Sequence, residues 1–230
     1  MKTIDLRFRF LSIFVVFVFV LSAYEAFGSI VYDWDGAEKD PLDRLQGWTQ
    51  QLPFDGELGV GTWMDHSAMF ATDTKSAGSP LYALAPKEDL SGDLTPYASI
   101  SWDEYIPARP NTNQSTFIIL EGSDGTRYQS GRLTGADIYT NHWYGRSVPL
   151  DDPSAWLFVN NSGSLSFEDV IADVAGLFLS MDSSTSSNGS VESWVDNFTV
   201  YSVPIPGAVW LLGSGLIGIA VFRRKFRRLI

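Results

Sequence analysis

The segment Ala98–Ile106 reads Ala-Ser-Ile-Ser-Trp-Asp-Glu-Tyr-Ile, and its alternation decides the fold class. Successive side chains of a β-strand point to opposite faces. Ile100, Trp102 and Glu104 are therefore predicted on one face of a strand, with Asp103 on the other. This pattern is typical of a half-buried strand. It also excludes Asp103 and Glu104 as a catalytic carboxylate pair with each other, since they point apart.

The rest of residues 29–202 follows the same pattern of short runs. β-Branched and aromatic residues alternate with Gly, Asp, Asn, Ser and Pro, which predicts an all-β sandwich. Ser123–Thr126 is typical of a hairpin turn. Ser166, with Asp169 three residues later, predicts one capped helical turn. Ser183–Ser190 is expected to be a flexible loop. The other predicted strands are Ile30–Trp34, Trp48–Leu52, Ala68–Ala71, Pro80–Ala85, Thr116–Glu121, Arg127–Ser130, Trp143–Pro149, Val174–Asp182 and Ser193–Tyr201.

Several landmarks stand in the order of one known family. Val31–Gly36 is followed by Gly47-Trp48, then by Asp89–Asp93, and the region closes with Val195–Val200. This order resembles the laminin B (laminin domain IV) relatives of the galactose-binding-like, carbohydrate-binding jelly rolls. The resemblance implies one jelly-roll β-sandwich spanning residues 29–202.

That family often holds a structural Ca²⁺ between its first and last strands. The matching positions here are Asp35 and Asp196, and Asp33 and Glu38 could assist them. Calcium prefers six to eight oxygen ligands, which carboxylates supply. The alternative is that these acids cap turns and face solvent.

The chain ends in a segment with three parts. Val203-Pro204-Ile205-Pro206 precedes an uncharged run at residues 207–222, and five Lys and Arg residues follow between 223 and 228. As a helix, the apolar run would be about 24 Å long, short of a bilayer core of about 30 Å. Residues 203–230 resemble a PEP-CTERM sorting signal with Ile205 in place of the usual Glu. This implies a transmembrane helix, a cytoplasmic basic tail and processing by an exosortase. The alternative is an ordinary single-pass anchor.

The beginning of the chain is typical of a secretory signal peptide. Lys2, Arg7 and Arg9 precede the apolar run Leu11–Leu21, and small residues occur at Ala26 and Gly28. We expect cleavage after Gly28, the alternative being an uncleaved anchor. The mature domain then carries eight basic against 25 acidic residues, a net charge of −17 compared with −11 for the whole chain. This charge argues against nucleic acid as a partner. The chain has no Cys, so disulfides cannot stabilise it.

Candidate functional residues point to binding rather than catalysis. The chain has two histidines and no recognisable nucleophile or acid–base motif. Five tryptophans, Trp34, Trp48, Trp102, Trp156 and Trp194, are predicted to be core. The candidates for sugar contact, on or beside loops, are Trp63, His66, Trp143, Tyr144 and Arg146. The alternative for the two tryptophans among them is the sandwich core.

The sequence therefore predicts an exported, envelope-associated, non-enzymatic protein. It would be released to the cell surface or the extracellular space after processing, and it would bind extracellular polysaccharide or act in a biofilm matrix. The alternative is a secreted glycan-acting enzyme whose carboxylate pair is not visible in the sequence.

Overall fold

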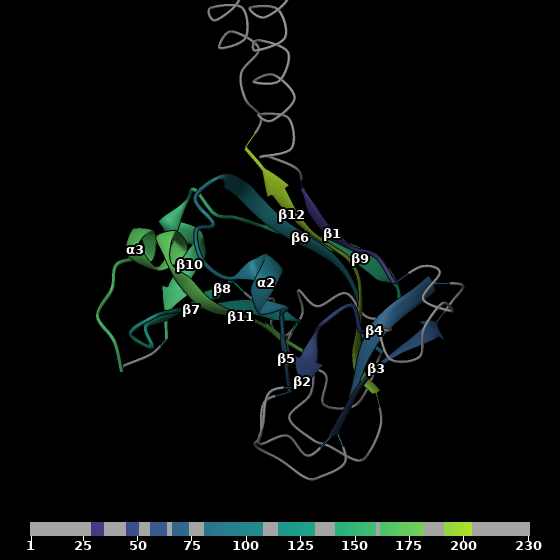
Figure 1. Ribbon diagram of the computed structural model, residues 1–230. Coiled ribbons are helices and arrows are strands. Elements are labelled where there is room, and N and C mark those ends of the chain that lie inside the picture. Colours follow the sequence, from purple (N-terminus) through teal and green to yellow (C-terminus); the bar gives the residue numbers. More distant parts are fainter. Residues whose placement is uncertain are drawn as a thin grey trace, which may run out of the picture.

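A computed structural model describes residues 29–34, 45–50, 56–63, 66–73, 81–107, 115–131, 141–159, 162–181 and 191–203. Within them the chain forms two antiparallel β-sheets (Figure 1). This confirms the predicted all-β sandwich. The predicted signal peptide at 1–28, the predicted loop at 183–190 and the segment from Pro204 onward fall outside the described residues. In the part that is described, no helix has the length and apolar character needed to cross a membrane.

The first sheet has six strands. Its order is β3 (Gly56–Trp63), β4 (His66–Asp73), β12 (Val191–Ser202), β6 (Tyr97–Tyr105) and β9 (Trp143–Pro149), with β1 (Ile30–Tyr32) also paired to β12. The long strand β12 pairs with β6 on one side, and with β4 and β1 in succession on the other. The first and last strands of the domain are thus adjacent, as the jelly-roll resemblance implies.

The second sheet also has six strands. Its order is β10 (Trp156–Phe158), β8 (Arg127–Ser130), β7 (Phe117–Gly122), β11 (Val174–Ser180), β5 (Tyr82–Leu84) and β2 (Thr49–Gln50). The short helices are α2 (Lys87–Leu90), η3 (Pro153–Ala155) and α3 (Phe167–Ala172). Among the described strands, the paired hairpins are β3–β4 and β7–β8, whereas most other connections cross between sheets. Repeated crossing is the connectivity of jelly-roll folds.

Each of the ten predicted strands overlaps an observed one, but two observed strands were not predicted. β10 is a three-residue edge strand. β3 contains Gly56, Gly59 and Gly61, and glycine is depleted in strands. β3 pairs with β4 along its whole length, from Gly56 opposite Asp73 to Trp63 opposite His66. This pairing stabilises a strand that its own composition does not favour.

The predicted turn and helix start are confirmed. Asp124 Oδ1 accepts a hydrogen bond from the Thr126 amide at 2.8 Å, and Gly125 takes the left-handed φ of +85° in the β7–β8 turn. At α3, Ser166 Oγ accepts from the Asp169 amide at 3.2 Å, and the Asp169 carboxylate accepts from Ser166. This reciprocal capping box satisfies amides that the first helical turn leaves unpaired.

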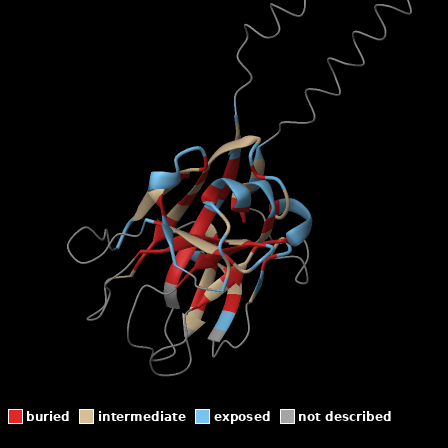
Figure 2. Cartoon of the chain, turned by 90° about the vertical axis from the view of Figure 1, so that its left-hand side faces the viewer, coloured by how far each residue is buried: buried red, intermediate tan, exposed pale blue. Residues whose placement is uncertain are grey.

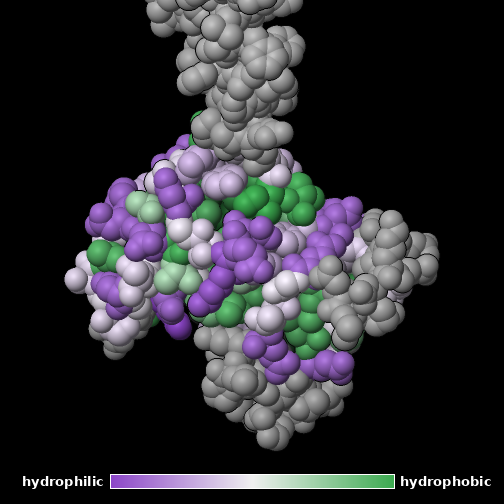
Figure 3. All heavy atoms as spheres, in the orientation of Figure 1, coloured by the Kyte–Doolittle hydropathy of each residue, from purple (hydrophilic) through white to green (hydrophobic). Residues whose placement is uncertain are grey.

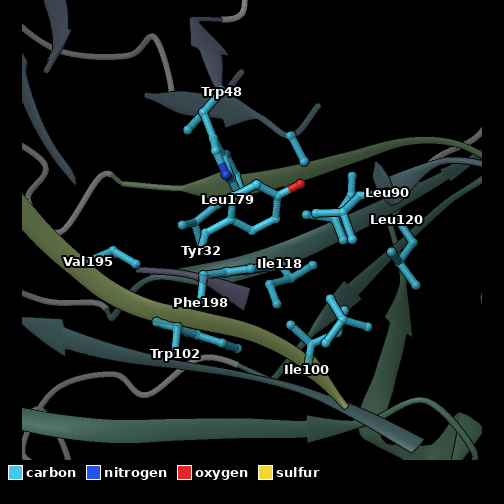
Figure 4. Close-up of a cluster of buried hydrophobic side chains, with 14 of the residues drawn as sticks. Tyr32, Trp48, Leu90, Ile100, Trp102, Ile118, Leu120, Leu179, Val195 and Phe198 are labelled. Atoms are coloured by element: carbon cyan, nitrogen blue, oxygen red, sulfur yellow. The ribbon is translucent and has the colours of Figure 1, made fainter. Parts of the chain in front are cut away.

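The core lies between the sheets, and Figure 2 shows buried residues along the strands and mostly exposed ones on the short helices. The close-up in Figure 4 shows Trp48 and Tyr32 gathered near Phe198, with Trp102, Ile100 and Ile118 beside them. The five tryptophans predicted to be core are all buried. The face in Figure 3 has hydrophilic and hydrophobic residues interspersed.

Candidate functional site

The first sheet has an outer face, the side turned away from the second sheet. On β6, Ile100 and Trp102 point inward into the main core, and Tyr105 belongs to a separate aromatic cluster. Strand alternation then places Asp103 on the outer face with Tyr105. The predicted phase of this strand is therefore confirmed, including the buried position of Glu104.

Aromatic residues occupy one level of the outer face across four neighbouring strands. Phe70 on β4 is opposite Trp194 on β12, Trp194 is opposite Tyr105 on β6, and Tyr105 is opposite Trp143 on β9. Together with Trp63 from β3 they form what we call the aromatic platform. Tyr105 and Trp194 are buried in it, whereas Phe70 and Trp143 are half-buried.

Glycines in β3 allow the platform to lie close against the sheet. A Cβ atom at Gly59 would lie 2.7 Å from the Phe70 ring. A Cβ at Gly61 would lie 3.2 Å from Phe70 and 3.4 Å from Trp194. The glycines that prevented the prediction of β3 from the sequence therefore leave space for the aromatic rings on this face.

Trp63 is the outermost member of the platform. Its ring stacks on Trp194 with centroids 5.6 Å apart and planes at 23°, and it also lies 5.6 Å from the Tyr105 ring. The side chain keeps 38% of its surface exposed. Buried rings thus support an indole that remains accessible to solvent.

His66 brings a polar group to the edge of the platform. Its ring centroid is 5.1 Å from that of Trp143, and its Nδ1 is 3.6 Å from Oδ2 of Asp196. β12 and β6 lie between the strands that carry His66 and Trp143. The rings of His66 and Trp143 therefore reach toward each other over these two strands. The Asp196 side chain beneath His66 is only 1% exposed. The structure therefore brings together Trp63, His66 and Trp143, three of the predicted sugar contacts.

A group of three polar residues, Asp103, Asp196 and Asn197, lies next to the platform. The sequence analysis did not assign this group to the sugar-binding site. Asp103 and Asp196 are opposite each other on β6 and β12. Asn197 has a left-handed φ of +50°. Its side-chain Nδ2 donates a hydrogen bond to Asp103 Oδ2 at 2.8 Å, and its backbone N–H donates one to Asp196 Oδ1 at 2.8 Å. The outward phase of Asp103 was visible in the sequence, but its neighbours depend on the pairing of strands about 90 residues apart in the chain.

Tyr144 and Arg146 are not on the outer face, although both were among the candidates for sugar contact on or beside loops. They lie within β9, where alternation turns them to the side opposite Trp143. Tyr144 Oη donates to Glu104 Oε1. Arg146 donates from Nη1 to Ser115 Oγ and from Nη2 to the carbonyl of Gly131, both at 2.7 Å. The two residues belong to a buried polar network instead.

Glu104 is the centre of that network and is fully buried. Its Oε2 accepts from the Thr116 amide at 3.0 Å and from Thr116 Oγ1, and its Oε1 is 4.0 Å from Arg146 Nη1. Burial raises the pKa of Glu104 to about 7, although Arg146 and the hydrogen bonds oppose this rise. Burial likewise lowers the pKa of Arg146. Burial therefore favours the protonated form of Glu104, whereas Arg146 and the hydrogen bonds of the network favour the ionised form.

The predicted calcium ligands are only partly within the described residues. Asp35 and Glu38 lie outside them. Asp33 follows β1, and its carbonyl accepts from Gln46 Nε2 at 2.6 Å. Asp196 is buried beside His66. Within the described ranges no group of three or more His, Asp or Glu residues is placed to hold a metal. A calcium site stays a prediction that depends on Asp35 and Glu38.

No family model matches the chain, and no curated protein matches it. Solved structures do match. The family 11 carbohydrate-binding module of a Clostridium thermocellum cellulase is 15% identical over 77% of this chain and 96% of its own, with a TM-score of 0.48. The L4b domain of human laminin α2 is 13% identical over 69% of this chain and 97% of its own, with a TM-score of 0.42.

A longer enzyme matches over part of its length. The chain of an arabinose-bound α-L-arabinofuranosidase is 11% identical over 76% of this chain but only 26% of its own, with a TM-score of 0.50. At this identity the likeness concerns the fold alone: this chain shares a two-sheet β-sandwich with one part of that enzyme.

Proposed function

We propose that this protein is exported and binds extracellular polysaccharide on the outer face of its first sheet, without cleaving it. The observation that carries the proposal is Trp63, an exposed indole stacked on the buried ring of Trp194. One side of this ring is open to solvent and the buried rings beside it fix its orientation, which is the arrangement that a stacking contact needs.

The platform suits a sugar ring for two physical reasons. A pyranose has an apolar face of C–H groups, and stacking it on an indole buries that surface at about 25 cal/mol per Å². The indole is also held in place by Trp194 and Tyr105, so little side-chain freedom is lost on binding. His66, Asp103 and Asn197 stand beside it with polar atoms for the hydroxyl groups.

Trp63→Ala should weaken polysaccharide binding by about 1–3 kcal/mol, roughly 5-fold to 150-fold in Kd. The reason is the loss of the exposed stacking surface, while the buried members of the platform stay. Binding should be measured by affinity electrophoresis over a panel of neutral, acidic and amino polysaccharides, with the melting temperature checked in parallel.

Tyr201→Ala is the matched control. Tyr201 is 47% exposed and also belongs to β12, but it lies seven residues beyond Trp194, about 24 Å along the strand. This variant should bind like the wild type. Equal weakening by both substitutions would point to non-specific apolar contact, and unchanged binding by Trp63→Ala would remove the platform as the site.

A second candidate, glycan hydrolysis, has one observation in its favour. Asp103 and Asp196 are opposite carboxylates on one face, and a retaining glycosidase needs a pair about 5 Å apart. Against it, Asp196 is buried and both carboxylates are engaged by Asn197. Release of reducing ends by the purified protein, abolished by Asp103→Asn, would replace binding with hydrolysis as the function.

The export part of the proposal rests on the sequence of the two ends. The order Pro204-Ile205-Pro206, apolar run and basic cluster supports sorting by an exosortase-type enzyme, and the start of the chain supports a signal peptide. Mass spectrometry of protein from cells that have an exosortase should then find no peptide from residues 223–230. Recovery of an intact C-terminus would favour a permanent membrane anchor.

A further inference from the structure

Among the described residues, no Lys or Arg side chain lies on the outer face around the platform. The three Lys and Arg side chains in the described part of the chain all lie elsewhere. Lys87 begins α2, and Arg127 on β8 pairs with Glu121 at 2.5 Å and lies over the Phe178 ring of the second sheet. Arg146 is turned into the sandwich, with 12% of its side chain exposed. No described basic side chain except the imidazole of His66 therefore reaches the outer face.

Carboxylates, in contrast, occupy that face. Asp103 is half-buried and two residues before Tyr105, which places it about 7 Å from the platform along β6. Its strand neighbour on β9 is Gly145, and even a Cβ atom there would lie 3.3 Å from Asp103 Oδ1. Because Gly145 has no side chain, it leaves the Asp103 carboxylate uncovered on this side. Glu57 on β3 is exposed farther along the same face.

We propose that the platform selects glycans that carry protonated amino groups, so that its ligand class is amino-sugar polymers rather than neutral or uronic-acid polymers. This inference rests on the proposed function. Asp103 would accept a charge-assisted hydrogen bond from the ammonium group of a residue next to the one stacked on Trp63. A uronate at the same place would meet the like charge of Asp103, and no described Lys or Arg side chain lies beside it to form an ion pair.

The test compares two ligands that differ only in the group on the amino nitrogen: the hexasaccharide of β-1,4-linked glucosamine, with free ammonium groups, and its fully N-acetylated, uncharged form. Because the acetyl group also changes size and hydrogen bonding, the effect of charge is read from how Asp103→Asn changes the ratio of the two affinities. Calorimetric titration of the full chain in detergent at about pH 6 keeps the amines protonated. The wild type should bind the glucosamine form about threefold to tenfold more tightly. Asp103→Asn, which keeps the shape and an acceptor for Asn197, should bring this ratio close to one while affinity for the N-acetylated form stays unchanged.

Glu88→Gln is the control for general attraction to an acidic protein, since Glu88 is exposed on α2, away from the platform. It should preserve the ratio. A ratio of one in the wild type, or an equal fall in Glu88→Gln and Asp103→Asn, would overturn the inference. Failure of the proposed function looks different: Trp63→Ala would then leave the binding of both hexasaccharides unchanged.

Discussion

Replacing Glu104 with alanine is expected to lower the free energy of unfolding by about 3–5 kcal/mol. This is the usual cost of removing one partner from a buried ion pair. The Thr116 amide, Tyr144 Oη and the Arg146 guanidinium would lose the carboxylate they surround. Arg146 would remain as a buried cation without its counter-charge. Urea unfolding should show the loss as a lower midpoint with an unchanged slope.

The same residue should make the stability of the domain depend on pH. The pKa of Glu104 is about 7 in the folded state, above its ordinary value of 4.5. Between these two values the unfolded chain loses the proton while the folded one retains it, so stability falls as pH rises from about 4.5 to 7. The fall amounts to about 3 kcal/mol, and it is complete above the folded pKa.

Glu104→Gln tests this assignment, because glutamine cannot lose a proton. The decline in melting temperature between about pH 4.5 and 7 should become much smaller in this variant. Glu88→Gln should keep the wild-type profile, since Glu88 is exposed. If the profiles of wild type and Glu104→Gln coincide, another group causes the dependence.

Trp48→Ala should destabilise the domain by about 3–5 kcal/mol, the usual cost of removing a large buried aromatic side chain. Trp48, just before β2 of the second sheet, packs edge-on against Tyr32 at 5.7 Å and Phe198 at 5.0 Å (Figure 4). It therefore connects the second sheet to the neighbouring strands β1 and β12 of the first sheet. For a domain of this size the melting temperature should fall by about 6–20 °C, which scanning calorimetry can measure.

Trp48→Phe is the matched variant and should lose less. It retains a ring between Tyr32 and Phe198, and the Trp48 Nε1 atom has no hydrogen-bond partner among the described residues. A loss as large as that of the alanine variant would contradict packing as the cause.

Local alternation made much of this fold predictable. The faces of Ala98–Ile106, the five core tryptophans and the Ser166 capping box all follow from short-range patterns. The strand β3 was not predicted because its glycine-rich sequence does not favour a strand by itself. Its extended conformation is stabilised by pairing with β4. Trp143–Pro149 was correctly predicted as a strand, but its alternation was not applied to the candidate sugar contacts. That alternation places Tyr144 and Arg146 on the side opposite Trp143.

The candidate site could be predicted only as separate residues. Trp63, His66 and Trp143 were identified by type, but their meeting depends on four strands pairing in one register. The contribution of Asp103 likewise depends on Gly145 being its neighbour on β9. Such juxtapositions follow from tertiary pairing, which a single sequence does not encode in any local pattern.

The length of β12 has a mechanical consequence. The strand carries Trp194 of the platform near its start and leads to Val203 at its end, so tension between a bound polymer and an anchored C-terminus would run along it. Its hydrogen bonds to β6, β4 and β1 lie across that direction. They would be sheared together rather than opened one at a time. If the C-terminus is held at the cell surface, this geometry would therefore resist a pull from bound polymer along the strand.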